Sequence, residues 1–195
     1  MPRTASETRS HVLQVAGELF YDNGIRATGV DHVAAEAGVA PTTLYRLFDS
    51  KDGLVGSYVE RMHHDFQSVC EAAAEAAGPD PRDQILAIFD TVFAEVSSDR
   101  YRGCAMLKTL AEFPDPALPA HRNAVAAKSW LRQTLRELTG RLGVADPGTL
   151  ADQLMLVLDG MHATGQSLGP TGPAKQARRL AETLLSAAAP PSDAL

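Results

Sequence analysis

Five polar side chains lie close together on one short stretch of the chain, and their chemistry suits nucleic acid. Thr42 and Thr43 carry hydroxyls, Tyr45 a phenol and Arg46 a guanidinium, and Lys51 follows with an ammonium. Hydroxyl and guanidinium groups bind phosphate oxygens and read base edges in the major groove, and an ammonium suits a phosphate. The set therefore predicts a surface that contacts DNA.

The apolar residues around this set predict two short helices joined by a tight turn. Apolar side chains recur at helical spacing, first at Val30, Val33, Ala34 and Ala37, and then at Leu44, Leu47 and Phe48. Gly38 suits the left-handed backbone that ends a helix, and Pro41 suits a first helical position. Thr28 or Gly29 can cap the first of the two helices. The pattern is a helix-turn-helix, whose second helix enters the major groove.

Residues 8–56 resemble the tetracycline-repressor (TetR) family of bacterial regulators. The resemblance is carried by Gly24, Ala27, Thr28, Val30, Val33, Ala34, Ala37, Gly38, Val39, Thr43, Leu44, Tyr45, Phe48, Ser50 and Lys51. It implies an all-α, TetR-like fold of about nine helices. Residues 1–50 would form a three-helix DNA-binding domain, and residues 51–195 a helical ligand-binding and dimerisation domain. A double-stranded, palindromic DNA operator would then be contacted by Thr28, Thr42, Thr43, Tyr45, Arg46 and Lys51.

Net charge limits how the chain can bind DNA. The formal charge is −6, and residues 1–60 contain five basic and eight acidic side chains. Strong non-specific binding through a broad basic surface is therefore not expected. Binding must depend on a local group of cations, on helix N-termini that point at phosphates, and on two copies acting together.

Composition excludes several other classes of protein. No run of eighteen apolar residues predicts a membrane span, and the first residues lack an apolar signal region, so we expect a cytoplasmic protein. Cys70 and Cys104 fit no metal spacing or disulfide framework. No phosphate loop, nucleophile motif or paired acids are present, so we expect no enzymatic activity, no metal and no cofactor. Cys104 could be a redox switch, although a buried thiol is the favoured interpretation.

Helical periodicity continues through the rest of the chain. It predicts helices over residues 5–23, 51–77, 81–97, 103–113, 117–142, 147–168 and a last one that ends near residue 189. Segments rich in proline and glycine separate them. Residues 150–168 are apolar around almost the whole helix, which indicates burial on both sides.

The family resemblance implies that the last two helices of two subunits form a four-helix bundle. We expect a homodimer whose interface includes Leu154, Leu158, Met161, Gly165, Leu180 and Leu184. The alternative is a monomer whose central helix is covered by its own chain.

The resemblance also implies a pocket for a small-molecule effector among the middle helices. The expected lining is Met62, Phe66, Phe89, Phe93, Cys104, Leu107, Lys108, Ala111, Trp130, Met155, Asp159 and His162. For each apolar member taken singly, a place in the core is the favoured interpretation over contact with the ligand. Asp159 and His162 are costly to bury, so they either pair with each other or meet a polar ligand. Lys108 and Glu112 could form a surface pair or reach the pocket.

These observations favour a homodimeric transcriptional regulator, a repressor that a small ligand releases from its operator. The alternative is a helical ligand-binding or interaction module, or an enzyme on the same helical body, without operator recognition. The acidic N-terminal segment favours the alternative, and the outward set around Tyr45 favours the regulator.

Overall fold

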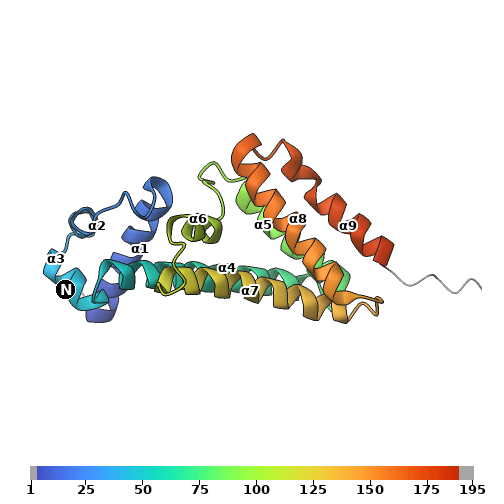
Figure 1. Ribbon diagram of the computed structural model, residues 1–195, viewed down its shortest axis with the longest axis horizontal. Helices are drawn as coiled ribbons and strands as arrows, with labels where there is room; N and C mark the ends of the chain where they lie inside the picture. Colours follow the sequence, from blue (N-terminus) through green and yellow to red (C-terminus); the bar gives the residue numbers. More distant parts are fainter. Residues whose placement is uncertain (1–3, 189–195) are drawn as a thin grey trace, which may run out of the picture. The chain divides into compact units, whose positions relative to one another are not determined.

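The computed structural model describes residues 4–188, and these form nine α-helices and one 3-10 helix without any strand (Figure 1). The elements are α1 (Ala5–Asn23), α2 (Val30–Glu36), α3 (Pro41–Phe48), α4 (Lys51–Ala76), α5 (Pro81–Val96), α6 (Ala105–Glu112), α7 (Pro119–Gly140), α8 (Pro147–Leu168), η1 (Pro173–Gln176) and α9 (Ala177–Ala188). The predicted all-α fold class is confirmed, and the predicted helix ends in this range lie within two residues of those observed. Residue 189, the predicted end of the last helix, lies outside the described range.

Local sequence signals explain where the helices begin. Thr4 and Glu7 form a capping box at the start of α1, in which each side chain accepts from the other residue's backbone amide. Asp80 and Asp146 cap α5 and α8 with their carboxylates, and a proline occupies the first helical position after each. No helix within residues 4–188 is long and apolar enough to cross a membrane.

Contacts divide the chain into two compact units. The first unit comprises residues 1–64 and 105–127, and the second comprises residues 65–104 and 128–195, with the structure itself limited to residues 4–188. The predicted domain boundary after residue 50 falls inside the first unit and stays a prediction.

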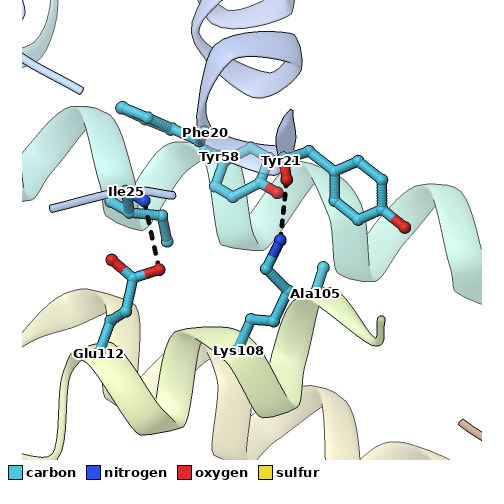
Figure 2. Close-up of a pocket in the computed structure, with 7 residues that line it drawn as sticks. All are labelled: Phe20, Tyr21, Ile25, Tyr58, Ala105, Lys108 and Glu112. Carbon is cyan, nitrogen blue, oxygen red and sulfur yellow. Dashed lines mark hydrogen bonds between the residues drawn. The ribbon is translucent and has the colours of Figure 1, made fainter. Parts of the chain in front are cut away.

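The first unit packs the helix-turn-helix onto neighbouring helices. Leu44 and Phe48 of α3 are buried together with Val33 of α2 and with side chains of α1 and α4. Phe20 of α1 meets Tyr58 of α4 edge to face, with ring centroids 5.4 Å apart (Figure 2). These contacts stabilise α3, which has only eight residues and would not form alone in water.

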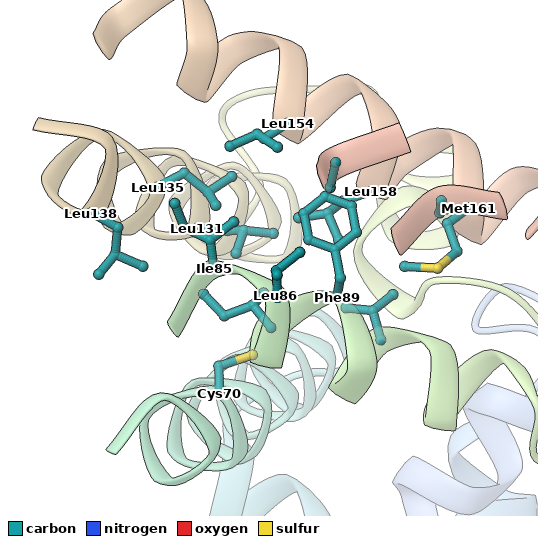
Figure 3. Close-up of a cluster of buried hydrophobic side chains, with 14 of the residues drawn as sticks. Cys70, Ile85, Leu86, Phe89, Leu131, Leu135, Leu138, Leu154, Leu158 and Met161 are labelled. Atoms are coloured by element: carbon teal, nitrogen blue, oxygen red, sulfur yellow. The ribbon is translucent and has the colours of Figure 1, made fainter. Parts of the chain in front are cut away.

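The second unit is built around a cluster of buried, mostly aliphatic side chains from α4, α5, α7, α8 and α9 (Figure 3). Ile85, Phe89, Leu135, Leu154 and Leu158 are all fully buried there. Helix α8 packs against both α5 and α9. One side of α8 is therefore covered within the single chain, whereas the side that carries Leu156 is exposed, so burial on both sides stays a prediction.

Gly165 of α8 lies close against Val96 of α5, and its substitution gives the first test. A Cβ atom at Gly165 would lie 2.3 Å from Cγ1 of Val96, and Val96 is itself buried. We expect Gly165→Ala to lower the free energy of unfolding by about 2 kcal/mol through overpacking, as measured by urea denaturation. Gly140→Ala is the matched control, because a Cβ atom there would meet nothing within 4 Å. Equal stability of the two variants would contradict this packing.

Candidate nucleic-acid interface

Helix α3 presents the polar set that the sequence predicted to contact DNA. Thr42 and Arg46 are exposed, Thr43 is half-buried, and Tyr45 is 49% exposed. The opposite side of α3 is buried through Leu44 and Phe48. An eight-residue helix therefore offers hydroxyl, phenol and guanidinium groups on its solvent side.

A short turn with a defined backbone conformation precedes α3. Gly38 adopts a φ of 65°, as predicted, and the Val39 amide donates to the Ala34 carbonyl at 2.9 Å. The His11 ring of α1 lies 3.1 Å from the Ala37 carbonyl, which ties the turn to the first helix. Ala40 is the N-cap of α3 and provides no side-chain hydrogen bond.

A second tight link connects α3 to α4. Asp49 has a φ of 61° and its amide donates to the Tyr45 carbonyl at 2.8 Å. Ser50 then caps α4, since its hydroxyl accepts from the Gly53 amide at 3.0 Å, as the sequence predicted. Lys51 begins α4, and its Nζ donates to the Arg26 carbonyl at 3.4 Å.

Thr28 differs from the other predicted DNA contacts because it is only 2% exposed. Its hydroxyl donates to the Gly24 carbonyl at 2.8 Å, since a buried hydroxyl needs an acceptor. In this structure Thr28 thus stabilises the loop between α1 and α2. Arg9, which sequence reasoning missed, is exposed and lies 4.8 Å from the centroid of the Phe48 ring. Its guanidinium also donates to Ser57 at 3.0 Å.

Helix α6 holds the end of α1 and the loop that follows it (Figure 2). Lys108 donates to the Tyr21 carbonyl at 2.8 Å, which suits a cation at a helix C-terminus. The Glu112 carboxylate accepts from the amides of Ile25 and Arg26 at 3.2 and 2.7 Å. These residues pack so closely that the cleft between them has no room for a drug-sized ligand, for which a pocket of ~300 Å³ or more is expected.

The predicted pocket residues are divided between the two units. In the first unit, Met62 and Leu107 are half-buried, Ala111 is exposed, and Lys108 is engaged as just described. In the second unit, Phe89 belongs to the fully buried core, and Phe66, Phe93, Trp130 and Met155 are partly buried around it. Phe66 and Trp130 meet edge to face, with centroids 6.2 Å apart.

The two polar residues predicted within α8 do not pair with each other. Asp159 forms an ion pair with Lys128 of α7. His162 is 4% exposed, and its Nδ1 lies 2.9 Å from the Tyr101 hydroxyl, which donates to the His162 carbonyl at 3.1 Å. Burial, helped by the nearby Lys128 ammonium and opposed by Asp159, lowers the pKa of His162 to about 4. The imidazole is therefore neutral at pH 7.

Sequence reasoning missed a partly buried acid in the second unit. Glu95 of α5 is half-buried, and burial raises the pKa of its carboxyl group against the opposing effect of Lys128. A signal was available, because Glu95 follows Ile88 by seven residues and Val92 by three, which places it beside the apolar face of its helix.

The two cysteines differ in their surroundings. Cys70 is buried, and burial, followed by the charges of Glu95 and Glu71, raises the pKa of its thiol to about 12. A thiol with such a pKa is protonated and unreactive at neutral pH. Cys104 is half-buried, and its two interpretations, a small buried thiol or a redox switch, stay predictions.

The residues predicted at the dimer interface have unequal exposure. Leu154, Leu158, Met161 and Gly165 are buried within the single chain, whereas Leu184 is half-buried and Leu180 is 48% exposed. On the opposite side of α8, Leu156 is 73% exposed, and Gly160 and Ala163 are exposed with it. Because α8 is apolar all round, periodicity did not show which of its sides the chain's own core would cover.

Comparison with known proteins places this geometry in a family. Residues 12–58 match the model of bacterial regulatory proteins of the tetR family. The HTH-type transcriptional regulator YjdC of Escherichia coli K12 is 26% identical over 177 residues, which cover 91% of this chain and 93% of that protein.

Solved structures agree with this match over almost the whole chain. A TetR transcriptional regulator from Chloroflexus aurantiacus shares the fold, with a TM-score of 0.80 at 22% identity, and the match covers 93% and 96% of the two chains. A TetR-family transcriptional regulator from Streptomyces coelicolor is 32% identical, with a TM-score of 0.89 and coverage of 95% of this chain and 97% of that one. The chain belongs to the TetR family, and it is a DNA-binding regulator and not an enzyme.

Proposed function

We propose that this protein is a homodimeric repressor that binds a palindromic operator through α3 and is released from it by a small-molecule effector. The observation that carries the proposal is the exposed set of Thr42, Tyr45 and Arg46 on a helix whose other side is fixed by buried Leu44 and Phe48. Family members bind DNA operators as dimers and respond to ligands. The operator, the effector and the interface described below are proposals for this chain.

Within the interface, different side chains have different tasks. Arg46 is placed to read a base edge, and the phenol of Tyr45 and the ammonium of Lys51 suit phosphates. Thr42 and Thr43 lie in the first turn of α3, where hydroxyls and backbone amides can approach the same phosphate. Because the first sixty residues carry more acids than bases, these few contacts have to supply the affinity.

The exposed side of α8 and the neighbouring side of α9 form the proposed dimer surface. On α8 it contains Leu156, Gly160 and Ala163 at a spacing of four and three residues, and on α9 it contains Leu180 and Leu184. Small residues at Gly160 and Ala163 allow a second helix to approach closely. The proposed surface keeps the two α9 residues that the sequence predicted. On α8 it consists of different residues from those predicted, because the chain's own core covers the predicted ones.

The second unit contains the groups that we propose to meet the effector. The Tyr101 hydroxyl lies 2.9 Å from Nδ1 of His162 and 3.1 Å from the His162 carbonyl oxygen, and the other ring nitrogen, Nε2, is the proposed contact for the effector. Together with Asp159 and the partly buried Phe66 and Trp130, this nitrogen suits a small molecule with an aromatic body and a hydrogen-bonding group. The effector would release DNA by binding one subunit arrangement more tightly than the other.

The function as a whole is tested by selection of binding sites from random duplex DNA with the purified protein. We expect an inverted repeat whose half-sites are spaced by about one helical turn or a multiple of it. A thermal-shift screen would then find effectors, which raise the stability of the folded state and should release the selected duplex. Recovery of no specific sequence would contradict the proposal.

Arg46 and Tyr45 give the test of DNA contact. We expect Arg46→Ala to weaken operator binding by about 1–3 kcal/mol and to relax the preference at one position in each half-site, as a base-reading residue does. Tyr45→Phe should weaken binding to all sequences to a similar extent, because it removes only the hydroxyl. Both are measured by fluorescence anisotropy. Arg136→Ala, which removes an exposed arginine of α7, is the control and should leave affinity unchanged.

Leu156 gives the test of assembly. Since its side chain is already in contact with solvent in the single chain, Leu156→Asp should leave the subunit folded but convert the dimer into a monomer in sedimentation velocity experiments. Operator affinity should fall by at least ~100-fold, because the two half-sites are no longer bound together. Val69→Asp places the same charge at another exposed apolar position and should remain dimeric. A dimeric Leu156→Asp protein would exclude this surface.

The buried neutral state of His162 predicts a dependence of stability on pH. Its pKa is about 4 in the folded state and 6.5 ordinarily, so between these values only the unfolded chain binds the proton. Stability from this group is present above pH 6.5 and is lost as the pH falls towards 4. Between pH 7 and 5, the native protein should lose about 2 kcal/mol more than His162→Gln in urea unfolding. Parallel losses in both proteins would show that His162 titrates normally.

A further inference from the structure

Glu112, at the end of α6, has no assigned part in the proposed DNA contacts or in effector binding. Its two carboxylate oxygens accept from two successive backbone amides, Oε1 from Ile25 at 3.2 Å and Oε2 from Arg26 at 2.7 Å. Hydrogen bonds to a charged acceptor are stronger than neutral ones, and both amides lie in the loop between α1 and α2. One side chain of α6 therefore fixes the backbone of this loop.

Arg26 is attached to the end of α6 a second time, through its own side chain. Its Nε donates to the Glu112 carbonyl at 2.7 Å, and its guanidinium lies 5.4 Å from the centroid of the Phe113 ring. The amide and the side chain of Arg26 are thus both held by two neighbouring residues. These contacts restrict the movement of Arg26, and with it of its carbonyl, relative to α6.

That carbonyl is the acceptor for Lys51. The Nζ atom of Lys51 donates to it at 3.4 Å, and Lys51 is separated from α3 only by Asp49 and Ser50. A continuous series of hydrogen bonds therefore runs from the Glu112 carboxylate, through the backbone of Arg26, to the ammonium beside the recognition helix. All of its members belong to the first compact unit.

We propose that Glu112 is a positioning residue for DNA binding, which holds the Arg26 carbonyl so that Lys51 is kept beside α3 in position for an operator phosphate. The inference rests on the phosphate contact that the proposed function gives to Lys51. A lysine side chain loses rotamer entropy when it is ordered, so a carbonyl that orders it in the free protein lowers the cost at binding. The acid acts on affinity without touching DNA.

A purely structural role for Glu112 would look different in a salt titration. A phosphate contact releases counterions, so the plot of log K against log salt has a negative slope. Losing one contact makes that slope less steep by about 0.9. General destabilisation of the fold lowers the apparent affinity because fewer molecules are folded. The folded molecules still make the same phosphate contacts, so the salt slope of their binding is unchanged. The slope therefore separates the two roles.

The experiment compares the native protein with Glu112→Gln, Lys51→Met and the double variant, using the selected operator over a series of salt concentrations. Glutamine keeps the shape of the side chain but offers only one acceptor oxygen to the two amides. We expect Glu112→Gln to weaken operator binding roughly tenfold, as the loss of one charged hydrogen bond does. It should also make the negative salt slope less steep by about 0.9. In the Lys51→Met background the same substitution should have less than about a twofold effect, since the contact is already lost.

Glu137→Gln is the matched control, because it removes the same charge from an exposed side chain of α7 that accepts from Gln133. It should change neither the affinity nor the slope, and thermal unfolding of each variant confirms that it is folded. The inference is overturned if Glu112→Gln leaves the slope unchanged or is as damaging in the Lys51→Met background as in the native protein. An unchanged slope in Lys51→Met would reject the phosphate contact itself, while the tests on Arg46 and Tyr45 would still decide the proposed function.

Discussion

The recognition helix is too short to be stable without the chain around it, and this constraint shapes the whole first unit. Helix α3 has eight residues, whereas isolated helices shorter than ~12–15 residues are marginal in water. Its conformation depends on burial of Leu44 and Phe48 and on two tight links, one at Gly38 and one at Asp49. The side chains of α3 that face solvent contribute little to stability. They can therefore differ according to the DNA sequence that is bound, without loss of the fold.

Polar groups inside the two units follow a common rule, which is that burial is tolerated where a specific partner exists. Lys128 meets Asp159, and His162 meets Tyr101. The carboxylate of Glu112 satisfies two loop amides. Unpaired buried polar groups cost free energy, and such pairs fix the relative positions of helices more narrowly than aliphatic packing alone. In the second unit, burial raises the pKa of the half-buried Glu95 carboxyl, and the nearby Lys128 ammonium opposes that rise.

The sequence predicted the helices well because the signals for them are local. Proline, glycine and capping residues mark most boundaries, and the apolar period identifies the buried side of α3 from Leu44 and Phe48. The sequence could not predict the contacts of Glu112, because its partners are 86 and 87 residues away and no short-range pattern encodes such a contact. Thr28 was assigned to DNA from the family resemblance, but the structure shows its hydroxyl turned inwards. In α8, Leu156 and Leu158 look equivalent by hydropathy, and only packing shows that one is exposed and the other buried.

The acidic character of the chain has a consequence for how a regulator of this kind distinguishes its operator. Non-specific binding depends on the number of phosphates that cations neutralise, and residues 1–60 have five basic side chains against eight acids. Any long stretch of DNA is therefore a poor ligand for one subunit. Affinity at the operator has to come from base-edge and phosphate contacts made by a few ordered groups and from the joining of two subunits. Specificity is the ratio of operator binding to binding at other DNA sequences. An acidic N-terminal segment that binds other sequences weakly therefore raises this ratio without any additional base contact.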